Sequence, residues 1–306
     1  MESCENSLLK NKISIGLSLD MSVEEYLDIF DKYEGYIHSL YFSPPLSGKY
    51  HSRQLIEQQF EDPQVVERFY KILELSKAKG ILLDCVLNRP SISDADVKRA
   101  VEYLKGIDVD QITCLQKDID VIHEEFFEKE LIYSYNNDLT PEKIETISSK
   151  FTSVVVGKYF LRSPKLLKRI CDDGFKLKLL VNNGCSFNCK GCQSGTMQCK
   201  ETFDKNISKH DLNYLYALQS LYPNERLELL SYINLPIESI KISNRTDGYE
   251  YLDKCLDSYI NMVDPQCFIN EKTSNFRLWS RLGWFNSLFD CLDNKEIVKI
   301  KQKGFK

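Results

Sequence analysis

Four cysteines that lie close together in the chain have the clearest capacity for chemistry. Cys185, Cys189, Cys192 and Cys199 fall within fifteen residues, directly after an apolar run that is typical of a buried strand. Glycines between and beside them permit the backbone turns that let four sulfurs converge on one centre. Because thiolates are soft ligands that select iron-sulfur clusters or zinc over hard cations, this spacing predicts a metal site.

Two other roles for these cysteines are open. Reduced, partly buried cysteines could simply pack, although packing cysteines are not usually clustered beside glycines. A disulfide framework requires export, and the polar segment Met1–Lys12 lacks the apolar stretch of a signal peptide. We therefore expect a cytoplasmic protein in which free thiols persist.

Polar side chains at the ends of predicted strands form a second candidate group. The expected substrate-binding residues are Asn88, Asn136, Asn182, Asn183, Asn244 and Arg245. In a barrel of parallel strands these positions meet at one mouth, where amides could hydrogen-bond a polar substrate without adding charge. Asparagine is also a common turn former, so each has a structural alternative.

The chain carries no recognisable hydrolytic motif. Its four histidines, His38, His51, His123 and His210, show no paired metal spacing, and no Gly-x-Ser-x-Gly elbow is present. His38 and His123 fall within predicted elements, which favours structural roles. His51 and Arg53 follow a Ser-Pro-Pro loop, where solvated side chains are expected.

Alternating strands and helices must position these residues. Eight short runs are predicted as strands, at Ile13–Leu19, Ile37–Phe42, Ile81–Leu87, Gln111–Leu115, Leu131–Tyr135, Ser153–Val156, Phe175–Val181 and Ser239–Ser243. Helical patterns follow them, for example at Pro63–Lys79 and Asp118–Glu128, and several begin with start signals such as Ser22-x-x-Glu25. Eight such units favour a closed (β/α)8 TIM-type barrel over a doubly wound open sheet.

Composition is that of an ordinary globular protein. In the 306 residues, 42% are hydrophobic and 28% charged, and no run approaches the roughly 20 apolar residues of a membrane span. We therefore expect no membrane partner. A net charge of -5 provides no global basic field for nucleic acid, although a local basic rim stays open.

Residues 266–306 are expected to form a short C-terminal extension to a barrel over residues 1–265. Phe276, Trp279, Trp284, Phe285 and Phe289 lie in this segment, which ends in lysines. An apolar helix face packed on the barrel is the simpler interpretation, and a protein-partner or nucleic-acid contact is the alternative. Cys267 and Cys291 are outlying thiols that could also serve as ligands.

Two segments resemble the collagenase-like peptidase family, class U number thirty-two in the peptidase classification. They are Val181-Asn-Asn-Gly-Cys185-x-x-x-Cys189 and Ile240-Lys-Ile-Ser-Asn-Arg245, followed by a helix with Tyr251 and Cys255-x-x-x-Tyr259. The resemblance implies a barrel that carries a four-iron four-sulfur cluster on cysteines. It also implies a family that includes proteins for oxygen-independent hydroxylation of ubiquinone precursors, transfer RNA and ribosomal RNA.

Residue by residue, Cys185 and Cys189 match the loop cysteines of the family, and Cys199 is similar in position to a later one. Cys192 stands where relatives usually have proline or a nearby residue, and Asn244 replaces the common glycine before Arg245. These departures leave the ligand set and the substrate open. The substrate expected from the resemblance is a small molecule, a peptide or RNA.

Three rival functions are kept. The spacing of Cys185, Cys189 and Cys192 also resembles radical S-adenosylmethionine enzymes, but their cysteine loop follows the first strand, and here seven predicted strands precede it. A closed tetrahedral zinc shell on the four cysteines would be structural only. Proteolysis follows from the family label alone, so redox modification of a polar substrate is favoured.

Overall fold

The computed structural model describes residues 7–46, 60–88, 92–134, 141–157, 160–161, 163–181, 234–242 and 248–262. Its strands are β1 (Ile13–Gly16), β2 (Ile37–Phe42), β3 (Leu82–Leu87), β4 (Gln111–Cys114), β5 (Glu130–Tyr133), β6 (Ser153–Val156), β7 (Lys176–Leu180) and β8 (Ile237–Ile242). Its α-helices are α1 (Val23–Lys32), α3 (Pro63–Ala78), α4 (Asp94–Leu104), α5 (Ile119–Glu125), α6 (Pro164–Asp172) and α10 (Gly248–Ile260). Short 3-10 turns are η1 (Ser7–Leu9), η2 (Gln116–Asp118) and η3 (Pro141–Thr146).

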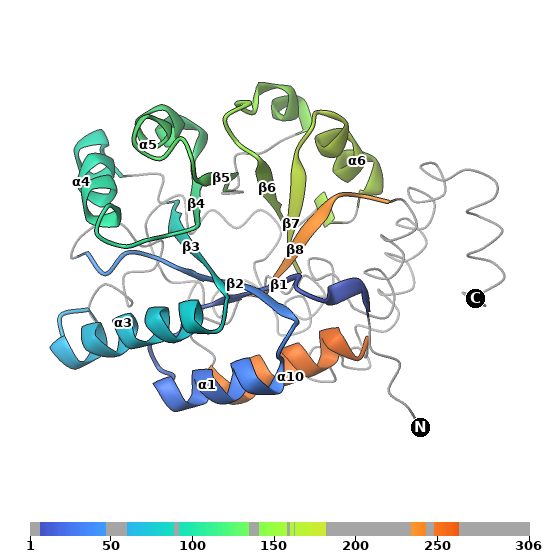
Figure 1. The fold of residues 1–306 in the computed structure, drawn as a ribbon. Helices are drawn as coiled ribbons and strands as arrows, with labels where there is room; N and C mark the ends of the chain where they lie inside the picture. Colours follow the sequence, from blue (N-terminus) through green and yellow to red (C-terminus); the bar gives the residue numbers. More distant parts are fainter. Residues whose placement is uncertain are drawn as a thin grey trace, which may run out of the picture.

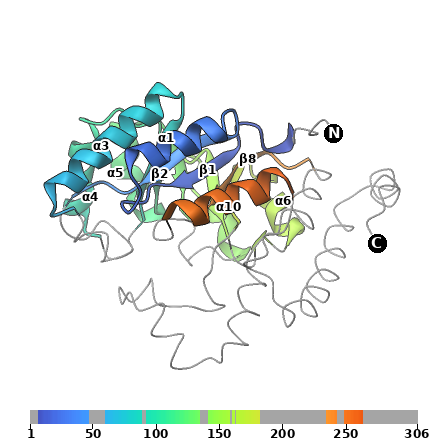
Figure 2. The same ribbon diagram turned by 90° about the horizontal axis from the view of Figure 1, so that it is seen from below.

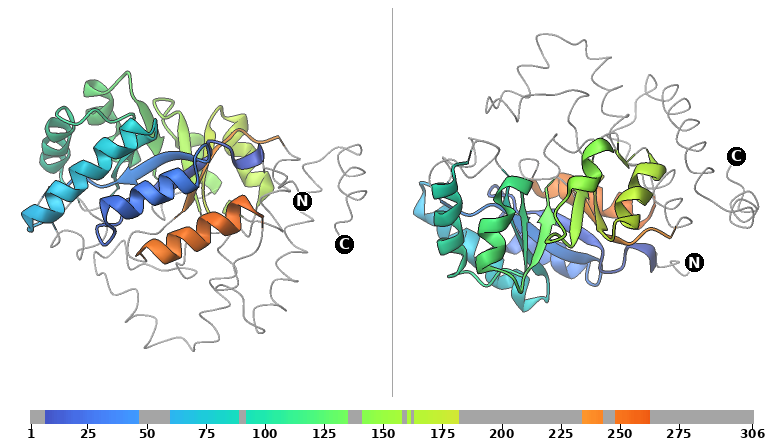
Figure 3. Two further views of the ribbon diagram at one scale, coloured as in Figure 1. Left: turned by 60° about the horizontal axis from the view of Figure 1, so that its bottom comes forward. Right: turned by 90° about the horizontal axis from the view of Figure 1, so that it is seen from above.

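The eight strands form a closed, wholly parallel barrel in sequence order. Each strand pairs with the next, and β1 also pairs with β8, so the ring has no free edge (Figure 1). The helices lie outside the strands in both views of Figure 3. The predicted TIM-type barrel is therefore confirmed, and the open doubly wound sheet is excluded.

The first and last helices of the described chain lie side by side (Figure 2). Lys32 of α1 pairs with Asp253 of α10 at 2.6 Å, and Tyr33 Oη donates to the same carboxylate at 2.8 Å. These contacts join the helix that follows the first strand to the helix that follows the last. Residues 263–306, including the predicted C-terminal extension, lie outside the described residues.

Local sequence signals account for the element bounds. Ser22 caps α1 with its side chain on the Glu25 N–H, and Glu25 bonds back to the Ser22 N–H, which completes the predicted capping box. Apolar side chains from both sides of the strands build one core, and Ile13, Ile15, Leu83, Ile112 and Val154 are fully buried within it.

One predicted helix is wrong in its bounds. Instead of a helix from Asp118 to Glu128, the chain forms the 3-10 turn η2 and the short helix α5, which ends when Phe126 leaves helical geometry. Phe126 is buried, while Phe127 is 68% exposed. Burial of the first phenylalanine turns the chain toward β5 and stops the helix early.

Candidate site at the carboxyl end of the barrel

Asn88 is the predicted substrate-binding residue that falls within the described chain. It follows β3 directly and is half-buried, and its Nδ2 donates to the Oγ of Ser134 at 3.1 Å. Because Ser134 follows β5, this bond joins the ends of two strands that flank β4. Asn88 thus lies at the carboxyl mouth, as predicted, and its contact with substrate stays a prediction.

The remaining predicted site residues lie outside the described residues: Asn136, Asn182, Asn183, Asn244, Arg245, Cys185, Cys189, Cys192 and Cys199. The structure places the strand that leads to the cysteines. β7 runs parallel to β8, and the N–H of Val181 donates to the carbonyl of Lys241 at 3.2 Å. β7 therefore ends at the carboxyl face of the barrel, and Val181 is the last described residue before the segment with the four cysteines.

The cysteines of the described chain behave as core residues. Cys85, Cys114 and Cys255 are buried, and Cys171 is half-buried. Burial raises the pKa of Cys114 well above its usual range and that of Cys171 to about 12, so both remain thiols at neutral pH. No group of three or more metal-ligating side chains occurs among residues 7–181, 234–242 and 248–262 that the structure describes.

Charged side chains fill much of the barrel interior. Lys241 of β8 lies 3.3 Å from Asp84 of β3, and these strands are separated by β1 and β2, so the ion pair crosses the interior. Asp84 is fully buried and Lys241 is 5% exposed. Thr113 of β4 also donates to Asp84, at 2.7 Å.

Asp84 is held in its ionised form by these neighbours. Burial alone would raise its pKa, but the nearby ammonium groups of Lys241 and Lys178 and the hydrogen bond from Thr113 outweigh that effect. The pKa of Asp84 therefore lies below its usual value. A permanent pair of opposite charges results near the carboxyl end of the barrel.

Tyr41 of β2 contacts the Lys241 ammonium inside the barrel. The Lys241 ammonium lies 4.0 Å from the centroid of the Tyr41 ring, a cation–π contact, and Tyr41 Oη donates to the carbonyl of Ile242 at 2.7 Å. The Tyr41 side chain packs against β1 at Gly16, where an added Cβ would lie 2.9 Å from the tyrosine ring. Glycine is required there because any side chain would displace the tyrosine.

A second charged cluster surrounds Glu238, nearer the amino ends of the strands. It is called the lower cluster, and the Asp84–Lys241 pair is called the upper cluster. Lys178, which is fully buried, lies 3.1 Å from Glu238 and donates to Gln111 at 2.6 Å. Gln111 donates to Glu238 at 3.2 Å, and Ser153 also donates to this carboxylate. Burial alone would raise the pKa of Glu238, but the contacts with His38, Lys178 and Ser153 lower it by more, so the net pKa lies well below its usual range.

Two irregularities in strand pairing bring side chains to this cluster. Between β1 and β2 the register skips His38, and between β7 and β8 it skips Glu238. Such bulges re-aim side chains. Here the two extra residues meet, with 3.7 Å between His38 Nε2 and Glu238 Oε1. His38, for which a structural role is predicted, therefore lies beside the charged cluster.

These charged residues were missed by the sequence analysis. Lys178 and Lys241 stand inside apolar runs, Lys-Leu-Lys-Leu-Leu and Ser-Ile-Lys-Ile, and Asp84 interrupts Leu-Leu-Asp-Cys-Val-Leu. In a barrel whose strands are buried on both sides, an ionisable residue within such a run must face the interior or be paired. That signal could have located them before the structure.

Buried ion pairs of this kind are weak sources of stability, because desolvation offsets much of the Coulomb attraction. Perturbed pKa values, by contrast, cluster at functional sites. The group Lys241, Asp84, Tyr41 and Asn88 is therefore the candidate site of the described chain. Within it, Lys241 and Asp84 pair with each other inside the barrel, and Asn88 lies at the carboxyl end of β3.

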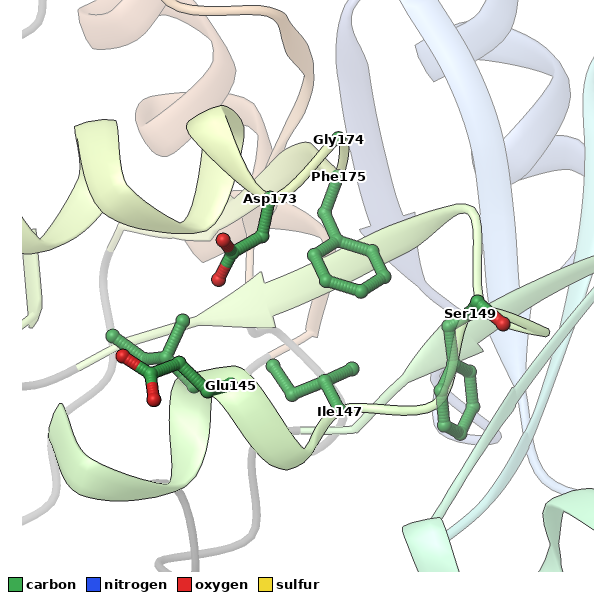
Figure 4. Close-up of a pocket in the computed structure, with 8 residues that line it drawn as sticks. Glu145, Ile147, Ser149, Asp173, Gly174 and Phe175 are labelled. Carbon is green, nitrogen blue, oxygen red and sulfur yellow. The ribbon is translucent and has the colours of Figure 1, made fainter.

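A cavity of about 320 Å³ lies outside the barrel, between η3 and the turn from α6 to β7 (Figure 4). Its floor is apolar and includes Ile147 and Phe175, and its rim carries Glu145 and Asp173. Phe175 precedes β7, so the cavity adjoins the amino end of that strand. The active sites of such barrels lie at the opposite, carboxyl face, so this cavity is not the candidate site.

Comparison with known proteins supports the fold. No family model matches the chain, and no curated protein matches it. A U32 peptidase, Mk0906, is similar in structure with a TM-score of 0.51 at 13% identity, covering 76% of this chain and 92% of that one. At this identity the likeness shows the barrel fold alone.

Two other solved barrels are similar at lower TM-scores. One is a tryptophan synthase alpha-subunit of Pyrococcus furiosus, with a TM-score of 0.43, 11% identity and coverage of 90% of this chain and 98% of that one. The other is the orotidine 5'-phosphate decarboxylase of Pyrococcus horikoshii OT3, with a TM-score of 0.42, 11% identity and coverage of 81% and 98%.

Proposed function

Because the chain has the barrel fold of a U32 peptidase, we propose that it binds a four-iron four-sulfur cluster through Cys185, Cys189, Cys192 and Cys199. The proposed activity is oxygen-independent redox modification, a hydroxylation, of a polar substrate at the same mouth. The observation that supports it is the exit of β7: Val181, at the carboxyl end of the barrel, lies four residues before Cys185.

The donor set fits such a group. Four thiols in one short glycine-containing segment are the usual ligands of an iron-sulfur cluster, whereas Cys85, Cys114 and Cys255 of the described chain are buried in the core. The cluster would supply one-electron chemistry when bound. The residues of the chain would bind and orient the substrate, with Asn88 donating or accepting hydrogen bonds and Lys241 holding an anionic or carbonyl oxygen.

The mouth also has the electrostatic character that substrate positioning needs. Lys241 is fixed between Asp84 and Tyr41, so its charge is present before substrate arrives and needs little reorganisation. The carbonyl of Lys241 accepts from Val181, which ties the strand that bears this cation to the strand that leads to the cysteines.

Anaerobic purification followed by iron, sulfide and zinc assay tests the proposal. We expect about four irons per chain and the visible charge-transfer absorbance of a thiolate-bound cluster. Cys185→Ala and Cys189→Ala should lose both, whereas Cys171→Ala, which removes a half-buried thiol of the described chain, should retain them.

Other outcomes would select the rival functions. Zinc without iron would support a closed structural shell. Iron together with reductive cleavage of S-adenosylmethionine would support radical chemistry. Cleavage of a gelatin-type peptide that survives Cys185→Ala would support a peptidase instead.

A further inference from the structure

A second cavity, of about 420 Å³, lies at the carboxyl ends of β4 and β5. Leu115, Tyr133 and Ile147 contribute apolar surface, and Lys117, Lys143 and Thr146 contribute polar groups. Leu115 directly follows β4, and Tyr133 is the last residue of β5. The cavity is thus built by the two segments that follow these strands, on the face where barrels bind their ligands.

The walls of this cavity are held together before any ligand binds. The Oε1 of Gln116, in η2, accepts from the N–H of Ser148 at 3.1 Å, which links the segment after β4 to the segment after β5. Lys150 and Asp120 add a second link at 2.6 Å. A cavity of this size with fixed walls is typical of a small-molecule site.

The charges around the cavity favour an anion. Lys143 is exposed and has no carboxylate partner among the described residues. Lys117 lies 2.9 Å from Oδ1 of Asp118 and donates to the carbonyl of Ile92 at 2.9 Å. Asp118 is itself buried, and within the described residues its Oδ2 has no hydrogen-bond partner, so the contact with Lys117 is made through Oδ1.

The cavity is distinct from the mouth described above. Tyr133 packs edge-on against Phe151, with 5.4 Å between ring centroids, whereas the next residue, Ser134, accepts the hydrogen bond from Asn88. The end of β5 therefore separates the two. A ligand in the cavity would contact Tyr133 on one side of this strand end, and a ligand at the mouth would contact Ser134.

We propose that this cavity binds a phosphate monoester that carries a small apolar body. The rim carries two ammonium groups, those of Lys117 and Lys143, against the one carboxylate of Asp118. A phosphate monoester, with nearly two negative charges at neutral pH and three acceptor oxygens, can accept hydrogen bonds from both lysines, which suits it better than a singly charged carboxylate. Leu115, Tyr133 and Ile147 then cover the apolar body. The inference is independent of the proposed cluster, because none of these residues belongs to the cysteine segment.

The neighbouring cavity in Figure 4 provides an internal contrast. It shares Ile147 but has Glu145 and Asp173 at its rim, so its charge has the opposite sign. A probe with an apolar ring and a cation should therefore not bind the basic cavity. Charge selectivity becomes a direct readout of which cavity is occupied.

Isothermal titration of the full chain with phenyl phosphate tests the proposal, with inorganic phosphate, benzoate and benzylamine as comparison probes. Phenyl phosphate should bind more tightly than the other three by about tenfold or more, which is about 1.4 kcal/mol. Lys143→Glu should weaken it by at least about tenfold, because the exposed cation is replaced by an anion. Lys254→Glu, on α10 and outside the lining, replaces another exposed lysine by an anion; it is the matched control and should change the affinity by less than about twofold.

A second variant guards against an indirect effect of charge. Thr146→Trp places a bulky side chain at an exposed lining position, so the fold should be retained while binding is lost. The proposal is overturned if phenyl phosphate fails to bind, if inorganic phosphate or benzoate binds equally well, or if Lys143→Glu and Thr146→Trp bind like the unaltered chain. Iron content should be the same in all these variants, so failure here is separable from failure of the cluster proposal.

Discussion

At the scale of single residues, the chain buries charges that a barrel core does not need. Lys178 is fully buried and Lys241 is nearly so, although lysine is almost never buried unless it is paired. Each has a carboxylate partner: Glu238 of the neighbouring strand β8 for Lys178, and Asp84 across the interior for Lys241. Removal of one member of a pair therefore leaves the other charge buried without its partner.

Removal of one member of the upper pair should be costly. Lys241→Met leaves Asp84 buried without its main partner, and we expect the free energy of unfolding to fall by about 3–5 kcal/mol in urea denaturation. The double variant Lys241→Met with Asp84→Asn should recover most of this loss, because no unpaired charge remains. Equal destabilisation of the single and double variants would show that the two side chains are not coupled.

A surface pair supplies the control for that experiment. Lys71 and Glu67 pair at 2.7 Å on α3, and their side chains are 57% and 66% exposed. Lys71→Met should change the free energy of unfolding by less than about 0.5 kcal/mol. The contrast isolates the effect of burial from the effect of losing a lysine.

Gly16 should be intolerant of even one methyl group. A Cβ there would contact the Tyr41 ring at 2.9 Å, so Gly16→Ala must move the ring and weaken its contact with Lys241. We expect a loss of about 1–3 kcal/mol of stability, measured by urea denaturation. Gly106→Ala, where the nearest atom is 3.4 Å away, is the matched control, and an equal loss there would argue against the clash.

At the scale of elements, two bulges decide which side chains face the interior. His38 and Glu238 are the extra residues of β2 and β8, and they meet within the lower cluster. Without the bulges, the strict alternation of strand residues would direct neighbouring positions to opposite sides. The bulges therefore assemble the Glu238 cluster and leave the apolar packing of the strands intact.

The lower and upper clusters predict an acid-labile fold. The pKa values of Glu238 and Asp84 are lowered in the folded chain, so each contributes stability that is present above its unfolded value, about 4, and is lost as pH falls through the folded value. The urea midpoint should thus stay level from neutral pH to about pH 5 and drop at lower pH.

Neutral replacement of Glu238 and Lys178 should make the fall of the urea midpoint at low pH, called the acid limb, less steep. Glu238→Gln with Lys178→Met removes one of the two titrating carboxylates of the interior and its partner together, so less stability remains to be lost on acidification. Measurement of the urea midpoint from about pH 6 to about pH 3 checks the prediction. An acid limb as steep as that of the unaltered chain would assign the effect to other groups.

At the scale of the whole molecule, closure of the barrel depends on contacts between the ends of the described chain. β1 pairs with β8, and α1 packs beside α10 with Lys32 and Tyr33 both bonded to Asp253. Among the described residues these contacts are between positions more than 200 apart in sequence, so they are made at a large loss of chain entropy.

A membrane span requires a helix of sufficient length and apolarity, and none of the described helices meets both requirements.

A double-mutant cycle on this junction tests its contribution. Tyr33→Phe and Asp253→Ala each remove the 2.8 Å hydrogen bond, and their effects on the free energy of unfolding should overlap by about 0.5–1.5 kcal/mol. Strictly additive effects would mean that the bond does not stabilise the closed ring. Lys168→Ala, which loses an exposed pair within α6, should change stability by less than about 0.5 kcal/mol.

The sequence alone determined the parts of the fold that depend on local pattern. The apolar runs and capping signals located eight strands and most helices, and the alternation predicted the closed barrel. It also placed Asn88 at a strand exit, because chain direction is the same in every strand of a parallel ring. The cysteine cluster was likewise visible as a spacing, and its metal stays a prediction.

Only the tertiary structure decided which charged side chains meet inside the barrel. Asp84 and Lys241 are 157 residues apart, and Lys178 and Gln111 are 67 apart, so no local pattern pairs them. Their contact depends on closure of the ring, on the two bulges and on the space left at Gly16 for Tyr41. Local propensities act within a few residues, whereas a buried charge is stable only where the folded chain brings its partner.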